Sequence, residues 1–292
     1  MTEPTIYRSE RARLDIEALY DRARARLAFE TQERLVPTRF GDTHVLQAGP
    51  EEASPIGVFQ GGNVVNPLTL AWFASLTDRY RIHAPDTIGQ PGKSSGARVS
   101  ANDASLGEWA ADVMDGLGVA AAAVIGISYG GGVVLRLAAL APERIERAVL
   151  VVPAGIADVP IGSMLSLAAG YLGYRAVARR SFVESTVRRL SGGHPDPLFV
   201  ESTALAFRGT ALDTEMPRNA TPEELRRLTA PVTVIVGEHD PLFRPDRVLP
   251  RAKALFTNLV AAETLPGCAH ILGPACADAL AARIGAFLDD PG

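Results

Sequence analysis

The chain is poor in the features that mark secreted, membrane-spanning and nucleic-acid-binding proteins. It has only 2 cysteines in 292 residues, and its net charge of −4 provides no basic excess to attract polyanions or anionic membranes. No apolar run approaches the ~18 residues of a spanning helix, and residues 1–10 lack the apolar run of a signal peptide. We therefore expect a cytoplasmic protein without a membrane or nucleic-acid partner. Cys268 and Cys276 could pair in principle, but a reducing cytosol favours two buried thiols.

Hydrophobic patterning is abundant and alternates along the chain in the manner of βαβ units. Apolar residues make up 47% of the sequence, enough for a sizeable core. The pattern predicts strands at 34–39, 43–48, 55–60, 80–84, 119–125, 148–152, 232–236 and 259–265. It predicts helices at 10–29, 67–76, 103–117, 222–228, 245–254 and 275–287. The expected class is α/β, with a mostly parallel twisted sheet flanked by helices and a β-meander formed by the first three strands.

One internal segment interrupts this alternation. Residues 157–220 contain helical stretches at 161–174 and 177–190 and no convincing strand. They are expected to form a helical lid or cap inserted into a core made of residues 34–156 and 221–292. Residues 1–33 carry an amphipathic helix and are expected to form an N-terminal helical extension.

Ser128 lies in the most informative segment, Gly126-Ile127-Ser128-Tyr129-Gly130. A buried strand precedes it and an apolar helix face follows it. This is the signature of a nucleophile elbow, where a sharp strand-to-helix turn exposes the serine hydroxyl and leaves no room for side chains at the flanking positions. Ser128 is therefore the candidate nucleophile.

A serine hydroxyl needs a base to remove its proton and an acid to orient that base. His270 lies in the loop between the last strand and the last helix, and Asp240 lies just past the strand at 232–236. Reactive groups of a parallel sheet gather beyond the carboxyl ends of its strands, and Ser128, Asp240 and His270 each follow such an end. They are the predicted nucleophile, acid and base, in the chain order Ser, Asp, His of the α/β-hydrolase triad.

The other candidates have simpler interpretations. His44 and His83 lie in predicted strands and read as packing or surface residues, and His194 lies in a Pro/Gly-rich loop where it is expected to be solvated. His239 directly precedes Asp240. Glu238 is the nearby rival to Asp240 and otherwise reads as a surface acid beside a turn.

From Arg34 to its carboxyl terminus, the chain resembles the α/β-hydrolase fold superfamily, in its lidded carboxylesterase-like branch. The resemblance rests on the elbow, on the late Asp and His, and on two loops. Gln60-Gly61-Gly62 stands where the family usually has His-Gly-x, and the segment 86–94 resembles the family's Asp-x-x-Gly-x-Gly-x-Ser loop with one extra residue. By this resemblance, the backbone N–H groups of Gly62 and Tyr129 form the oxyanion hole. Gln60 departs from the family pattern, which puts the support of that loop in question.

The resemblance implies a serine hydrolase that cleaves a carboxylic ester, or a related acyl bond, through a covalent acyl-Ser128 intermediate. Its expected partner is a small, apolar ester, and the chain is expected to be a monomer or a homodimer. Other triad chemistry on the same fold remains open: C–C bond hydrolysis, cofactor-free perhydrolysis, thioester cleavage or acyl transfer. A non-catalytic ligand receptor also remains open. No NAD, flavin or metal is expected, because the glycine-rich segments lack nucleotide-binding spacing.

Overall fold

Eight strands form one sheet in the order β1-β2-β4-β3-β5-β6-β7-β8 in the computed structural model, which describes residues 5–212 and 215–290. The strands are β1 (Gln32–Thr38), β2 (Gly41–Ala48), β3 (Pro55–Phe59), β4 (Arg81–Pro85), β5 (Ala122–Ile127), β6 (Ile145–Val151), β7 (Val232–Gly237) and β8 (Leu259–Leu265). From β4 to β8 across the sheet, every neighbouring pair is parallel, and β2 pairs antiparallel with both β1 and β4.

The sheet order corrects one expectation about the first three strands. They were expected to form a meander, but β4 lies between β2 and β3, and β3 pairs parallel with β4 and β5. Only β1 and β2 form a hairpin, joined through Gly41, whose φ of 113° suits glycine. Hydrophobic alternation locates a strand but carries no information about its neighbour, so the crossover was not visible in the sequence.

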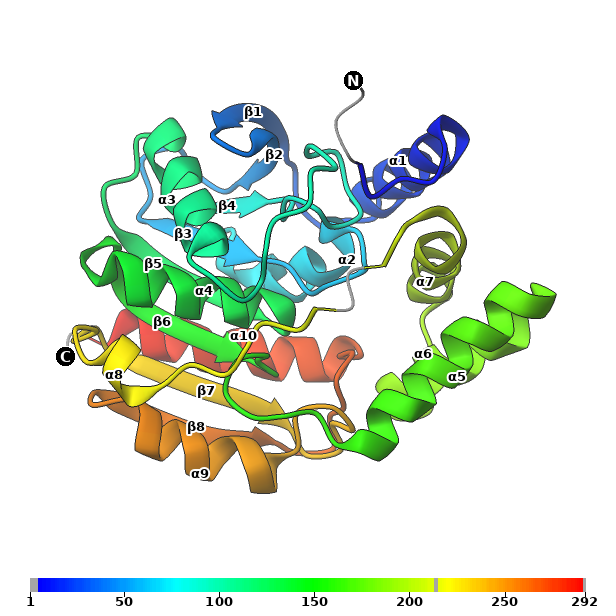
Figure 1. Cartoon of the computed structure of the whole chain (residues 1–292). Coiled ribbons are helices and arrows are strands. Elements are labelled where there is room, and N and C mark those ends of the chain that lie inside the picture. Colours follow the sequence, from blue (N-terminus) through cyan, green and yellow to red (C-terminus); the bar gives the residue numbers. More distant parts are fainter. Residues whose placement is uncertain (1–4, 213–214, 291–292) are drawn as a thin grey trace.

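Helices cover both faces of the sheet (Figure 1). They are α1 (Glu10–Arg24), α2 (Asn66–Leu70), α3 (Ser105–Leu117), α4 (Tyr129–Leu140), α5 (Ile161–Val177), α6 (Arg180–Leu190), α7 (Pro197–Gly209), α8 (Pro222–Leu225), α9 (Pro245–Leu255) and α10 (Pro274–Asp289). The predicted helix at 67–76 is split, because α2 ends at Leu70 and a 3₁₀ turn, η1 (Ala71–Leu76), follows.

The central strands are buried on both faces, as their sequences require. All six residues of β5 and all six of β7 are buried, so these strands read as continuous apolar runs rather than alternating ones. Their carboxyl ends point toward α5, α6 and α7, which group together at one side of the molecule (Figure 1). No helix in the described part of the chain is both long and apolar enough to cross a membrane.

The cysteines are not the free thiols that the sequence predicted. Cys268 and Cys276 form a disulfide that joins the loop after β8 to the first turn of α10, with a Cα–Cα distance of 5.9 Å. The expectation of reduced thiols came from an assumed reducing compartment and not from the spacing of the two residues. A separation of 8 positions is compatible with a bridge once the loop folds back on the helix.

Candidate active site

Ser128 occupies the sharp turn between β5 and α4. Its φ of 50° and ψ of −112° lie outside the regions that ordinary residues prefer, so the backbone at this position is strained. Three backbone hydrogen bonds hold the turn: the Ser128 N–H donates to Val151, and the Ser128 carbonyl accepts from Gly131 and Ala154, each at 2.9 Å. The surrounding structure therefore compensates for the strain and leaves the Ser128 side chain half-buried.

The two glycines of the motif are required by close backbone approaches. A Cβ on Gly126 would lie 2.5 Å from the carbonyl oxygen of Gly130, on the opposite side of the turn. A Cβ on Gly130 would overlap the carbonyl oxygen of Phe59, at the end of the neighbouring strand β3. Glycine at the second position therefore allows α4 to begin directly against β3, which places Ser128 beside the loop that follows Phe59.

Asp240 and His270 form a hydrogen-bonded pair at the carboxyl ends of β7 and β8. Asp240 Oδ2 lies 2.9 Å from His270 Nδ1, and the Asp240 side chain is fully buried. The other carboxylate oxygen, Oδ1, accepts from the backbone N–H groups of Leu242 at 2.7 Å and Phe243 at 3.0 Å. Four favourable contacts thus fix the pair, counting the Phe243 ring at 5.6 Å from the imidazole. Nε2 is the ring nitrogen of His270 that Asp240 leaves unbonded.

Glu238, the rival acid, lies elsewhere. Its side chain is half exposed, and Oε2 accepts from the backbone N–H of Gly267 at 2.7 Å. Glu238 therefore fastens the base of the loop that carries His270 and does not contact the imidazole. Among the described residues, His270 is hydrogen-bonded to Asp240 but not to Ser128. Contacts between a nucleophile and its base are commonly loose without substrate.

Ser128 and His270 open into a single cavity of about 310 Å³. Gly61, Gly62 and Tyr129 line it as well, so the predicted oxyanion donors and the predicted nucleophile share one space. Its remaining wall is mainly apolar and aromatic, formed by residues that include Trp72, Met164, Leu167, Tyr171, Phe199, Phe207, Leu212, Met216, Leu242 and Ile271. No described residue of the lining is Asp, Glu, Lys or Arg. The cavity thus suits an uncharged, largely apolar molecule.

The loop after β3 is held by side-chain amides. Gln60 is fully buried, and its Nε2 donates to the Val64 carbonyl at 3.0 Å, bridging the two ends of the loop. Asn63, whose φ of 58° is left-handed, donates its N–H to Gln90 Oε1 at 2.7 Å. Gln60 therefore supports the loop from within, although it replaces the family's usual histidine. Sequence reasoning missed Gln90, and its position in the lengthened loop at 86–94 was the available signal.

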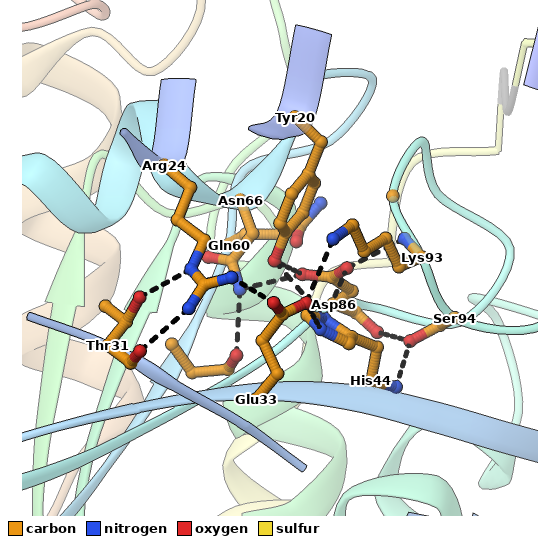
Figure 2. Close-up of polar contacts among 12 residues, drawn as sticks. Tyr20, Arg24, Thr31, Glu33, His44, Gln60, Asn66, Asp86, Lys93 and Ser94 are labelled. Atoms are coloured by element: carbon orange, nitrogen blue, oxygen red, sulfur yellow. Dashed lines mark hydrogen bonds and ion pairs between the residues drawn. The ribbon is translucent and has the colours of Figure 1, made fainter. Parts of the chain in front are cut away.

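A buried polar cluster lies beneath that loop and ties it to the N-terminal helix (Figure 2). Asp86 is fully buried and accepts from Tyr20 Oη at 2.8 Å, Asn66 Nδ2 at 3.0 Å and the Lys93 N–H at 2.8 Å. Asn66 is the first residue of α2, immediately after the loop. Asp86 thus joins α1, the start of α2 and the loop at 86–94.

His44 belongs to this cluster and is not positioned as a catalytic base. Its Nδ1 lies 3.2 Å from Asp86, and its Nε2 lies 2.7 Å from Glu33 (Figure 2). Burial alone would lower the pKa of His44, but the hydrogen bonds and charges of the two carboxylates outweigh it and raise the pKa above its ordinary value. His44 therefore links two carboxylates within the protein, which agrees with the packing role expected from the sequence.

The other histidines lie away from Ser128. His83 is buried on β4, where Gln47 lies 2.9 Å from its Nδ1, and burial together with the charges of Arg81 and Arg34 lowers its pKa to about 4. His194 and His239 are exposed. Among the five histidines, only His270 lines the cavity that contains Ser128.

A mostly parallel α/β sheet with a strained serine at the strand-to-helix turn after β5, and an Asp–His pair beyond the ends of β7 and β8, defines a hydrolase-type α/β protein. Comparison with known families agrees: the chain belongs to the alpha/beta hydrolase family, whose model matches residues 61–283.

Several relatives resemble the chain over most of its length. Carboxylesterase YbfK of Bacillus subtilis is 28% identical over 278 residues, which cover 92% of this chain and 92% of its own. The crystal structure of that esterase superposes with a TM-score of 0.84 at 25% identity, covering 96% of this chain and 99% of the other. Naproxen esterase of Bacillus subtilis shares the fold, with a TM-score of 0.84 at 23% identity and coverage of 94% and 98%.

A relative with a different activity matches a shorter region. The 2-hydroxymuconate semialdehyde hydrolase of Pseudomonas putida is 31% identical over 207 residues, covering 66% of this chain and 69% of its own. The family therefore contains more than one reaction, and the site of this chain must decide between them.

Proposed function

We propose that the chain is a serine hydrolase that cleaves carboxylic esters through a covalent acyl-Ser128 intermediate. One observation carries the proposal: a strained elbow serine and His270, which is hydrogen-bonded to the buried Asp240, line the same apolar cavity. The carboxylesterase relatives, which match nearly the whole chain, support ester hydrolysis as the activity.

The reaction follows from the positions of these groups. Ser128 Oγ attacks the ester carbonyl carbon as its proton passes to His270 Nε2, and Asp240 stabilises the resulting imidazolium through Nδ1. The N–H groups of Gly62 and Tyr129 donate to the oxyanion. His270 then returns the proton to the leaving alcohol, and the C–O bond to that alcohol breaks. Water repeats the sequence on the acyl-enzyme and releases the acid and free Ser128.

The cavity wall favours an uncharged ester over an acid-bearing substrate. A buried carboxylate needs a cation or several donors, and the described lining contains no lysine or arginine. C–C bond hydrolysis, an alternative that the sequence left open, remains a second candidate. Because aromatic side chains such as Trp72, Tyr171 and Phe207 form much of the wall, we expect bulky aromatic or branched esters to bind best.

We propose that residues 157–220 form the lid of this site, inserted into a core of residues 34–156 and 221–292, with residues 1–33 as an N-terminal extension. The helices α5, α6 and α7 support this division, because each contributes residues to the cavity wall opposite the sheet. Leu167 and Tyr171 come from α5, Thr186 and Leu190 from α6, and Phe199 and Phe207 from α7.

A fluorophosphonate probe tests the nucleophile and the reaction together. We expect mass spectrometry to find one adduct on Ser128, and Ser128→Ala to lose both labelling and hydrolysis of an aryl ester. Ser191→Ala, in the loop after α6, is the matched control and should retain both. Labelling at another residue, or undiminished ester hydrolysis by Ser128→Ala, would contradict the mechanism. Faster turnover of a thioester or of a C–C substrate than of any ester would reassign the reaction.

The remaining expectations stay proposals. We carry forward a cytoplasmic location, a monomeric or homodimeric state, independence from nucleic acid and independence from NAD, flavin and metal. The disulfide between Cys268 and Cys276 weighs against the cytoplasmic location, since cytosolic reductants usually keep thiols free. Cell fractionation with alkylation of free thiols before lysis, and native mass spectrometry, test the location and the oligomeric state.

A further inference from the structure

Helix α5 and the first turn of α6 expose an unusual concentration of apolar side chains. Of the 10 large exposed hydrophobic residues in the described chain, 6 lie between positions 161 and 182: Ile161, Met164, Leu165, Leu172, Val177 and Phe182. Ile161 is 79% exposed, Leu165 66% and Leu172 62%. Single exposed leucines are normal on protein surfaces, but a contiguous group marks an interaction site.

The three sides of α5 have different neighbours. Gly170 and Gly173 face α6, because a Cβ on either would overlap Thr186 or Phe182. Residues on a second side, such as Leu167 and Tyr171, line the cavity of Ser128. The third side carries an outer stripe, defined by the five residues Ile161, Leu165, Ala169, Leu172 and Ala176, whose spacings of about 3.6 residues place them on one face. All five are exposed.

The segment that carries the stripe contains charges of one sign. Residues 159–183 contain no Asp or Glu, although the whole chain has 33 acidic against 29 basic residues. They contain Arg175, Arg179 and Arg180, all exposed, at the carboxyl end of the stripe. Arg180 pairs with Glu184 at 2.8 Å, whereas Arg175 and Arg179 form no ion pair with a described residue, and Arg175 Nη1 donates to the Arg208 carbonyl at 3.2 Å. The stripe therefore ends in two positive charges that no described carboxylate neutralises.

We propose that this face of α5 binds the surface of an anionic lipid bilayer, with the outer stripe inserted among the acyl chains and Arg175 and Arg179 against the phosphate headgroups. Apolar helix faces flanked by cations bind such surfaces by these two contributions. The expectation that no membrane takes part rested on the whole-chain charge and on the absence of a long apolar run. Neither quantity reports a locally basic, apolar helix face.

A second copy of the chain fits the stripe less well. The 17-residue helix is about 26 Å long, so a face about 10 Å wide offers roughly 260 Å², against the roughly 800 Å² that each partner of a stable complex buries. A twofold contact would also bring the same acid-free segment against itself, leaving the arginines without carboxylates. A bilayer supplies both the apolar depth and the negative charge.

The location of the stripe gives the binding a consequence for the active site, one that rests on the proposed esterase function. Met164 lines the cavity and is also 41% exposed, so α5 separates the cavity from the proposed lipid surface by the thickness of one helix. An apolar ester that partitions into a bilayer would be concentrated beside the cavity wall.

Vesicle co-sedimentation tests the binding without requiring any catalysis. The Ser128→Ala protein is mixed with vesicles of phosphatidylcholine alone, or of phosphatidylcholine with phosphatidylglycerol. We expect binding to the anionic vesicles, a loss of about tenfold or more in Leu165→Glu/Leu172→Glu, and a loss of about fivefold for each arginine replaced in Arg175→Gln/Arg179→Gln. Leu35→Glu and Val260→Glu, at residues that are 58% and 52% exposed elsewhere, are the matched controls and should bind normally.

Three outcomes would overturn the proposal: equal binding to both vesicle types, insensitivity to the stripe substitutions, or equal losses in the controls. A concentration-dependent dimer that Leu165→Glu/Leu172→Glu abolishes would assign the face to a second copy instead. Neither Leu165 nor Leu172 lines the cavity. The protein that keeps Ser128 and carries only Leu165→Glu/Leu172→Glu should therefore hydrolyse a dissolved ester at an unchanged rate. Vesicle binding by a protein that hydrolyses no ester would leave this proposal standing and overturn only the proposed function.

Discussion

Reduction of the Cys268–Cys276 disulfide should lower the stability of the protein while leaving the catalytic rate of folded molecules nearly intact. His270 lies inside the loop that the disulfide closes, two residues after Cys268. The disulfide can act on His270 directly, by holding the loop, or on the whole chain, by restricting the unfolded state. The two effects can be separated by their magnitudes.

The unfolded-state effect is the better defined of the two. The cysteines are separated by 8 positions, and closing a loop of this length removes unfolded-state entropy worth about 2.5 kcal/mol at 25 °C. For a chain of this size each kcal/mol corresponds to roughly 2–4 °C in Tm, so reduction should lower Tm by about 5–10 °C.

The loop itself keeps other attachments when the disulfide is broken. The Cys268 carbonyl accepts from His239 at 2.8 Å, the Ile271 N–H donates to Leu190 at 2.8 Å, and the Gly267 N–H donates to Glu238 at 2.7 Å. At about 1 kcal/mol each, these bonds contribute about 3 kcal/mol. The loop would then be out of place in only about one molecule in a hundred. We therefore expect kcat at 25 °C to stay within about twofold of the oxidised value.

Thermal unfolding and ester hydrolysis, each with and without a phosphine reductant, test this reasoning. Cys268→Ala/Cys276→Ala should reproduce the reduced protein and no longer respond to reductant, which controls for effects of the reductant elsewhere. A Tm that reduction leaves unchanged would refute the entropy argument. A loss of kcat beyond about tenfold well below Tm would show that the three hydrogen bonds do not hold His270.

Three further changes test the site and the core. Asp240→Asn should lower kcat by about 10³- to 10⁴-fold in an ester assay with little change in Tm, because the amide favours the wrong tautomer of His270. A variant with unimpaired kcat would remove Asp240 from the mechanism. His83→Gln should flatten the acid side of the stability profile in urea titrations. The folded pKa of His83, about 4, lies below the unfolded value of about 6.5. Its contribution of about 3 kcal/mol to the free energy of unfolding is therefore complete above pH 6.5 and is lost as pH falls toward 4. An unchanged profile would count against the neutral buried imidazole. Gly130→Ala should yield little folded protein, because its Cβ overlaps the Phe59 carbonyl. Its control, Gly162→Ala, has no atom within 4 Å of the new Cβ and should raise Tm slightly. Normal yields of both variants would contradict the packing at the elbow.

Much of the fold was predictable because buried parallel strands have a distinctive sequence. The strands predicted at 119–125 and 232–236 correspond to β5 and β7, whose residues are all buried. The approximate positions of Ser128 and Asp240 followed from these strands, and that of His270 from the strand predicted at 259–265, since side chains just beyond strand ends meet at one edge of the sheet. The pairing of His270 with Asp240 was a prediction of this kind, and the structure places the two within 2.9 Å.

What escaped the sequence depends on contacts between distant segments. Hydrophobic patterning does not encode the neighbour of a strand, so the place of β4 between β2 and β3 was missed. The bridge between Cys268 and Cys276 depends on how the loop after β8 folds onto α10. The hydrogen bond from Asn63 to Gln90 joins two loops separated along the chain, and no local pattern marks it.

Asp86 shows why the departure at Gln60 need not weaken the site. In the proposed mechanism the loop between Gln60 and Asn66 presents the Gly62 N–H to the oxyanion, which requires its two ends to be fixed. Gln60 fixes the first end by bridging to Val64, and Asn66 fixes the second by donating to Asp86 at 3.0 Å. Asp86 in turn accepts from Tyr20 of α1 at 2.8 Å (Figure 2). A histidine at position 60 is therefore not the only way to hold this loop, because buried amides and a buried carboxylate supply the same restraint through hydrogen bonds within the protein.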